Sequence, residues 1–484
     1  MINSIQQFQV EGTKRLENIF KEYTNDLTKI AEMVYGVTEE ITKLGCNLIA
    51  EEWESYDELL CKNKHLRKGW HIVKKDKTSV ITSLGEVVYQ KTLFKNKTTN
   101  EYCYLLDHLM GMEKHTRITE DALARVLEEA SESSYRKGGA NVSIDGTSIS
   151  KEAVMNKIHS LQFPSPEVKE KKELKTIYID ADEDHVSLQY LEHKGDIKKP
   201  RVNTIMPRII YVYEGVDTDE EGRPRLINTK YFGGVYEGSE EIKKLWNEVL
   251  NYLNEAYDME HVERVYINGD GAPWIKVGVD IIPNSKFALD KYHMYKYIVA
   301  ATSHLEDSKD DAIGEIYRAI HKKKKKTAEE TFNKIIAVTD KETKCKAVEQ
   351  SKAYILGNWQ GIMASMKSND KNVKCSAEGH VSHVYADRMS SRPLGWCHTG
   401  ADKMSRLRIY RQNKGNMLEL VRFQKKEIPK VAGAEEVILS ARDMIISENA
   451  IRRKLGIYAD MTIYSIPYPQ IKKIAAIKDH IWGL

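Results

Sequence analysis

The sequence predicts an α/β core that contains a helical insertion and follows a mixed α+β N-terminal region. Three observations support this prediction. A strand-like segment at 176–189 carries alternating carboxylates, strand and helix patterns alternate from there to about residue 295, and a charged helical stretch follows. The length of 484 residues allows several domains, and 41% hydrophobic with 30% charged residues is typical of a globular protein.

Charge and cysteine content exclude several classes of protein. The formal net charge of +3 is nearly neutral, so contact with nucleic acid would depend on local clusters of Lys and Arg. The six cysteines form no CxxC pair, which disfavours a disulfide framework or a ribbon-type zinc site. Cys61 with His65, and Cys103 with His108, are conceivable zinc ligands, but buried thiols are the favoured interpretation. Neither a signal peptide nor an apolar run of roughly 20 residues is evident, so we expect a reduced cytoplasmic protein without a membrane partner.

The region 1–165 begins with helical apolar spacing over residues 1–60. Packing on the next domain is the favoured role of this helix, and self-association is the alternative. Residues 68–104 have the strand and turn residues of a small β-meander.

A helix-turn-helix-like segment is predicted at the end of this region. Thr119 is a suitable N-cap, Gly138-Gly139 indicates a turn, and Ser150 caps a second helix that ends near Leu161. An ordinary helical hairpin is the alternative. If the segment binds DNA, the candidate contacts are the polar residues of its second helix, Lys151, Asn156, Lys157 and His159.

The region 170–295 follows a linker with two prolines. Its patterns predict three strands, a helix, a strand, a helix and a strand, which is the order of a ribonuclease-H-like fold. Residues 296–370 are predicted to be a helical insertion. Within it, the lysine run at 322–326 is interpreted as a solvated helix face rather than a phosphate-binding one.

The region 371–415 is predicted to complete the core with a helix that starts close to Glu378. A basic stretch follows, in which Arg406 and Arg408 are candidate DNA contacts. The region 416–484 mixes helix and short strands, and its pattern indicates no function.

The candidate chemistry begins with Asp180, Asp182 and Asp184, which alternate and would share one face of a strand. Clustered carboxylates repel one another, and a divalent cation is the usual compensation. In a ribonuclease-H-like sheet the first and fourth strands are neighbours and the last helix packs across them. Asp182, Asp270 and Glu378 would then converge and hold two Mg²⁺ ions, for which Mn²⁺ could substitute.

Several motifs together are similar to a known family. They are Tyr102–Asp107, Ser134–Gly139, the Asp182 strand with its following Asp-His-Val, Gly269–Ile275, Phe287–His293 and Ala377–His383. With these motifs the chain resembles bacterial insertion-sequence transposases of the ISLre type, which are related to Mutator-like DDE transposases. The resemblance implies Asp182, Asp270 and Glu378 as catalytic triad and metal ligands. It implies a supporting role for Asp290 and His293, which match a Cys/Asp-x-x-His signature.

The resemblance also implies partners and a location. These are double-stranded DNA with terminal inverted repeats, a target DNA, a homodimer or larger assembly on DNA, and a nucleoid-associated place in a bacterial cytoplasm. Two other functions remain open: a DNA-binding regulator with a decayed nuclease fold, and a structure-selective DNA nuclease.

Each carboxylate also has a purely structural interpretation. Asp270 precedes a glycine and could be a turn residue, and Glu378 could be a first-turn acid that the helix dipole favours. Asp182 is the predicted ligand of its strand because it lies nearest the middle of 176–189. Asp184 is expected outside the metal shell and Asp180 behind it or at an edge, and Asp387 is the substitute candidate for Glu378.

Overall fold

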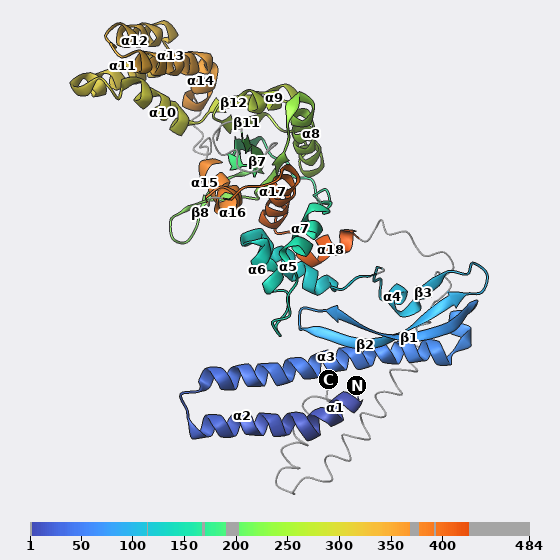
Figure 1. The fold of residues 1–484 in the computed structure, drawn as a ribbon. Coiled ribbons are helices and arrows are strands. Elements are labelled where there is room, and N and C mark those ends of the chain that lie inside the picture. The colour runs from blue at the N-terminus through green and yellow to red at the C-terminus, as the bar shows by residue number, and fades with distance from the viewer. Residues whose placement is uncertain are drawn as a thin grey trace. The chain divides into compact units, whose positions relative to one another are not determined.

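The structure is a computed structural model, and it describes most of the 484 residues. The described segments are 2–113, 115–166, 170–189, 203–367, 377–391 and 394–424. Of the predicted C-terminal region, residues 425–484 lie outside the described part. The chain divides into two units (Figure 1): Met1–Val126 with Arg136–Lys151, and Leu127–Tyr135 with Glu152–Gln424.

The first unit contains the helices and the three-stranded meander expected from the sequence. Its elements are α1 (Ile2–Gln7), η1 (Phe8–Gly12), α2 (Thr13–Asn25), α3 (Ile30–Lys62), η2 (Lys64–Arg67), β1 (Trp70–Ile81), β2 (Glu86–Asn96), β3 (Tyr102–Tyr104) and α4 (Leu105–Leu109). The strands pair antiparallel in the order β1-β2-β3. Helix α3 packs on β2, where the buried Asp57 carboxylate accepts hydrogen bonds from Thr92 N (2.9 Å) and Thr92 Oγ1 (2.6 Å).

The helix-turn-helix-like segment differs from its prediction. It consists of α5 (Glu120–Glu132), α6 (Tyr135–Ala140) and α7 (Lys151–His159). Gly138 and Gly139 do not form the expected turn, because both are buried residues within α6. Tertiary packing therefore overrides the low helix propensity of glycine here.

The second unit is built on a five-stranded sheet. Its strands are β4 (Thr176–Glu183), β7 (Pro207–Tyr213), β10 (Lys230–Val235), β11 (Arg264–Gly269) and β12 (Ser285–Leu289), and their order is β10-β7-β4-β11-β12. The pairs β10-β7 and β7-β4 are antiparallel, and the pairs β4-β11 and β11-β12 are parallel. Two short hairpins flank it, β5 (Val186–Ser187) with β6 (Thr204–Ile205) and β8 (Gly215–Thr218) with β9 (Pro224–Ile227).

One face of the sheet is apolar and covered by α8 (Gly238–Ala256) and α9 (Pro273–Ile281) (Figure 1). The expected apolar stripe of α8 is buried: Leu245, Trp246, Val249 and Leu253. The odd-numbered residues of β4, from Ile177 to Ala181, point to this face and join the same cluster.

The other face of the sheet is lined by tyrosines and covered by late helices. The tyrosines are Tyr178, Tyr211, Tyr213, Tyr231 and Tyr266. The covering elements are α15 (Ala377–Val381), η4 (Ser382–Ala386) and α17 (His398–Gln412), and α16 (Asp387–Met389) and α18 (Met417–Gln424) complete this part. A polar sheet face beneath helices requires hydrogen-bonding partners, and it is where the candidate site lies.

The helical insertion has a core of its own. Its elements are α10 (Lys291–Thr302), η3 (Glu306–Ser308), α11 (Lys309–His321), α12 (Lys325–Ala337), α13 (Glu342–Gly357) and α14 (Trp359–Lys367), grouped beside β12 in yellow to orange in Figure 1. The side chains of Lys322–Lys326 are exposed. None of the helices within the described segments combines the length and the apolar character that crossing a membrane requires.

The end of α7 belongs to the second unit rather than to a separate N-terminal domain that ends at residue 165. Leu161 O accepts a hydrogen bond from Lys403 Nζ (2.8 Å). Gln162 N donates to Gln424 Oε1 (2.8 Å), and Gln424 Nε2 donates to Gln162 O (2.9 Å). The expected boundary at the proline-containing linker therefore differs from the observed one, and residues 167–169 of that linker lie outside the described part.

Gly278 of α9 leaves no room for a larger side chain, because α9 packs closely against Trp246 of α8. A Cβ at Gly278 would lie 2.6 Å from the ring of Trp246, whose Nε1 donates to Trp274 O (2.8 Å) and thereby holds the ring in place. Gly278→Ala should lower the free energy of unfolding by about 1–3 kcal/mol. Gly314→Ala in α11 is the matched control, because nothing lies within 4 Å of its Cβ, and it should be neutral or stabilising. Equal unfolding midpoints of the two variants in urea would contradict this packing argument.

Candidate active site

The acidic strand is shorter than predicted. Strand β4 ends at Glu183, so Asp182 lies at its carboxyl end and not at its middle. Asp184 follows the strand: its N donates to Pro207 O (3.1 Å), and its Oδ1 accepts from Ser390 Oγ (3.0 Å). The alternation on one strand face therefore applies to Asp180 and Asp182 alone.

Asp180 is a completely buried residue of the central strand. Its carboxylate accepts hydrogen bonds from Tyr211 Oη (2.7 Å), Tyr213 Oη (3.1 Å) and Asn268 Nδ2 (2.6 Å). These donors come from both neighbouring strands, β7 and β11, so Asp180 ties three strands together. It lies behind the site, as expected, but not at an edge of the sheet.

Asp182 and Asp270 lie at the same end of the sheet, where β4 and β11 reach their carboxyl ends. Asn268 of β11 pairs with Asp180 of β4 in parallel register, and two further residues along each chain lead to Asp270 and Asp182. Burial, with the negative charge of Asp270 adding to it, raises the pKa of Asp182 to about 7. A smaller effect in the other direction comes from the hydrogen bond that Glu183 N donates to Asp182 Oδ1 (2.9 Å).

Asp270 is held in a tight turn between β11 and α9. Its Oδ1 accepts from Ala272 N (2.8 Å), and Gly271 has φ of +90°. The structural interpretation of Asp270 as a turn residue therefore applies, but one carboxylate oxygen can serve the turn while the other faces a ligand.

Asp290 and His293 form a pair beside the two carboxylates. Asp290 caps α10 by accepting from Tyr292 N (3.0 Å), and its Oδ2 accepts from His293 Nδ1 (2.8 Å). This hydrogen bond raises the pKa of His293, and the negative charges of Asp290, Asp270 and Asp182 raise it further. The imidazolium form is a counter-charge for the acidic pair.

The backbone of Glu378 lies in the first turn of α15, and α15 packs against β4. The side chain of Glu378 lies outside the described part of the structure. The neighbouring His380 is within this helix and its ring centroid lies 4.3 Å from that of Tyr211, while its Nδ1 is 2.8 Å from Tyr231 Oη. Burial lowers the pKa of His380 to about 4, so the ring is neutral and fixes α15 to the tyrosine face. Asp387, the substitute candidate, is 59% exposed and pairs with His383 (3.5 Å).

The donor chemistry of this edge fits a hard divalent cation. Asp182 and Asp270 offer carboxylate oxygens, which Mg²⁺ and Mn²⁺ prefer. The half-buried carboxyl group of Asp182, whose pKa is raised, would release a proton when a cation binds.

The predicted DNA contacts on α7 separate into two groups. Lys151, Asn156 and Lys157 are exposed, and the predicted inward residues Val154 and Ile158 are buried. His159 differs from the prediction, because it is half-buried and its Nε2 lies 4.0 Å from Cys397 Sγ. This position turns the ring toward the protein rather than toward a DNA surface.

The predicted DNA contacts Arg406 and Arg408 are engaged within the protein. Arg406 Nε pairs with Asp402 Oδ1 (2.8 Å), and its Nη1 donates to Tyr236 Oη (3.1 Å). Arg408 donates to three backbone carbonyls, including Ser131 O (2.9 Å). Charge density in the sequence does not distinguish such inward-facing guanidinium groups from DNA contacts, and this geometry does not favour the predicted role.

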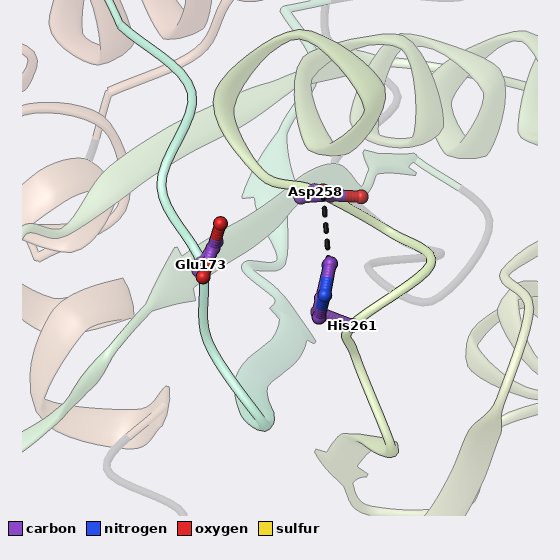
Figure 2. Close-up of side chains that lie close together, drawn as sticks. All are labelled: Glu173, Asp258 and His261. Atoms are coloured by element: carbon purple, nitrogen blue, oxygen red, sulfur yellow. Dashed lines mark hydrogen bonds and ion pairs between the residues drawn. The ribbon is translucent and has the colours of Figure 1, made fainter.

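Another group with metal-ligand residue types lies apart from this edge. Glu173, Asp258 and His261 have ligand atoms within 4.8 Å of one another (Figure 2), and Asp258 Oδ2 lies 3.0 Å from His261 Nδ1. Asp258 also accepts from Glu260 N (3.1 Å), so a surface turn with an ion pair accounts for the geometry. Neither cysteine–histidine pair considered for zinc contributes to such a group in the described residues. Cys103 is buried, as expected, whereas Cys61 is only partly buried.

Sequence reasoning missed two residues that contact the Asp270 turn. Tyr354 of α13 donates its hydroxyl hydrogen to Asp270 O. Asn358 follows α13, and its side chain lies against Gly271. The only signal in the sequence is a tyrosine in a charged helix, which does not indicate a contact 84 residues away.

Comparison with known proteins gives relatives of similar length. The UPF0236 protein TTE2489 of Caldanaerobacter subterraneus subsp. tengcongensis is 35% identical over 418 residues, which are 86% of this chain and 86% of the relative. A second protein of that organism, whose name joins eleven designations from TTE0033 to TTE2212, is 35% identical over 426 residues, 88% of this chain and 86% of the relative.

Among solved structures, the Drosophila P element transposase strand transfer complex aligns with 68% of this chain and 86% of its own. Its sequence identity is 8% and its TM-score is 0.22, so this likeness carries no argument about fold or function. The family described as Uncharacterised protein family (UPF0236) matches residues 23–427. The chain therefore belongs to the UPF0236 family.

Proposed function

We propose that the chain is a DDE-type DNA transposase, which cleaves and rejoins DNA strands at the ends of an insertion sequence. The observation that carries the proposal is the position of Asp182 at the carboxyl end of β4 and of Asp270 directly after the carboxyl end of β11, the parallel neighbour of β4. The packing of α15, the helix that contains Glu378, against β4 supports the same reading.

The order of the sheet supports a ribonuclease-H-like core. Numbered along the chain, its five strands lie in the order 3-2-1-4-5, with the first and fourth paired in parallel. The insertion α10–α14 lies between the second and third candidate ligands in the chain, where the resemblance to ISLre-type transposases requires it.

The names of the relatives also support mobility of the gene. One relative carries eleven numbered designations in a single organism. Many copies of one gene in one genome are the expected product of transposition.

In this proposal, Asp182, Asp270 and Glu378 hold two divalent cations. When bound, these cations supply activation of the attacking oxygen and charge stabilisation at the leaving oxygen of a phosphodiester. The residues of the chain prepare the site. Asp180 fixes β4 to both neighbouring strands. The hydrogen bond to Asp290 raises the pKa of His293, which favours a positive charge beside the acidic pair.

The proposed partner is double-stranded DNA with terminal inverted repeats. The exposed Lys151, Asn156 and Lys157 on α7 are the remaining candidate contacts. Joining two element ends requires two active sites, so we propose a dimer or larger assembly on DNA. Phosphate contacts should make binding weaken as salt concentration rises.

The test uses the full-length protein with labelled duplexes that carry the ends of its own genetic element. With Mg²⁺ or Mn²⁺ we expect cleavage at the end of the repeat, and with EDTA none. Glu378→Gln should remove cleavage and leave binding unchanged in a gel shift, because the amide keeps the shape of the side chain but not its charge.

Other outcomes would favour the alternatives. Sequence-specific binding without cleavage under any metal would indicate a regulator with a decayed nuclease fold. Cleavage that ignores the repeat and produces no strand transfer would indicate a nuclease. If Glu378→Gln cleaves normally, Glu378 is not the third ligand, and Asp387→Asn is the next variant to measure.

A further inference from the structure

The helical insertion contacts the Asp270 turn directly. Tyr354, in the last turn of α13, donates its hydroxyl hydrogen to the backbone carbonyl of Asp270. This carbonyl belongs to the peptide that joins Asp270 to Gly271, the point at which the chain leaves β11. The hydrogen bond therefore restricts rotation of the peptide next to a proposed metal ligand.

The hydroxyl of Tyr354 is held rigidly as a donor. Its ring stacks on that of Tyr297 at a centroid distance of 3.7 Å and an interplanar angle of 15°. Burial, together with the negative charge of Asp270, raises the pKa of Tyr354 well above that of an ordinary tyrosine. An ordinary phenol is protonated at neutral pH, so the stacked ring presents a hydrogen-bond donor to the carbonyl of Asp270.

A second contact restrains the same turn from the same side. Gly271 has φ of +90°, and a Cβ placed on it would lie 2.7 Å from Asn358 Oδ1. Asn358 is itself fixed to α13, because its N and its Nδ2 both donate to Tyr354 O (3.0 Å each). Tyr354 and Asn358 therefore restrain the Asp270–Gly271 turn together.

Tyr297, which stacks on Tyr354, connects this pair of residues to His293. Tyr297 lies on α10 four residues after His293, so the two side chains lie on the same side of the helix. Helix α10 therefore reaches the acidic pair through His293, and it holds through Tyr297 the tyrosine that restrains Asp270.

We propose that Tyr354 is a positioning residue for the second metal ligand, so that the insertion sets the affinity of the site for divalent cations. This inference rests on the proposed function, since it assigns a metal to Asp270. In this role Tyr354 acts through the backbone of Asp270, whose carbonyl accepts its hydroxyl hydrogen.

The test is Mn²⁺ binding to full-length protein without DNA, measured by electron paramagnetic resonance of the free ion, with wild type, Tyr354→Phe and Asp182→Asn. Tyr354→Phe keeps the ring and its stack on Tyr297 but removes the donor. We expect its dissociation constant for Mn²⁺ to rise about 3- to 10-fold, the range for loss of one hydrogen bond. The Mg²⁺ concentration for half-maximal cleavage should rise by a similar factor.

Tyr317→Phe in α11 is the matched control, because it also deletes one tyrosine hydroxyl from the helical insertion. Its dissociation constant for Mn²⁺ should equal that of wild type. Unfolding midpoints in EDTA establish that each variant is folded. If wild type binds Mn²⁺ more tightly than Asp182→Asn but Tyr354→Phe equals wild type, the positioning role is wrong and the proposed site stands. If wild type and Asp182→Asn bind Mn²⁺ equally, the proposed metal site itself is wrong.

Discussion

Asp182→Asn should reduce strand cleavage on the order of 10³-fold, because a neutral amide cannot hold a cation as a carboxylate does. The position of Asp182, level with Asp270 at the carboxyl edge of two parallel strands, is the physical reason. Burial and the nearby charge of Asp270 raise the pKa of Asp182 to about 7, and a bound cation would favour its ionised form. The measurement is the single-turnover cleavage rate of an end-labelled duplex at saturating Mg²⁺.

Two neighbouring substitutions are the controls. Asp184→Asn should keep measurable cleavage, because Asp184 lies after the strand, where Ser390 Oγ donates to it at 3.0 Å. Asp180→Asn should keep measurable cleavage for each folded molecule, since its completely buried side chain positions β4 and is not a proposed cation ligand. Full activity of Asp182→Asn with an inactive Asp184→Asn would mean that the register of the site is displaced by two residues.

The sequence could identify the acidic strand but not the role of each acid. Alternation treats Asp180 and Asp182 alike, and only the observed end of β4 at Glu183 and its register with β11 distinguish them. One of the two reasons for selecting Asp182 was incorrect, because the strand is shorter than expected and Asp182 lies at its end. The other reason, the resemblance to the transposase family, does not depend on the length of the strand. Strand ends depend on pairing partners distant in sequence, here β7 and β11, and local pattern does not contain that information.

The sequence also could not show whether a charged or polar side chain points to solvent or into the protein. Arg408 looks in sequence like a DNA contact, yet its donors serve three carbonyls from α5 and η4. His159 follows two exposed polar residues of α7 but turns toward Cys397. By contrast, the contact between Asp290 and His293 could have been predicted from their spacing, because a helix N-cap and the residue three positions later are neighbours by local geometry alone.

Asp180→Ala should lower the free energy of unfolding by about 3–5 kcal/mol, because it removes a carboxylate that accepts hydrogen bonds from three buried donors, at about 1–3 kcal/mol each, partly offset by relaxation. The loss is large compared with about 5–15 kcal/mol for a typical domain, so partial unfolding at 37 °C is expected. Urea denaturation followed by circular dichroism measures it.

Tyr213→Phe provides the comparison, because it removes one donor at 3.1 Å and leaves the carboxylate with two others. It should cost about 1 kcal/mol. The double variant Asp180→Ala/Tyr213→Phe removes both the donor and the acceptor of one hydrogen bond. Its loss of unfolding free energy should therefore be smaller than the sum of the losses in the two single variants. Strict additivity would show that Asp180 and Tyr213 are not coupled, and that the polar layer beneath the candidate site does not stabilise the sheet through this carboxylate.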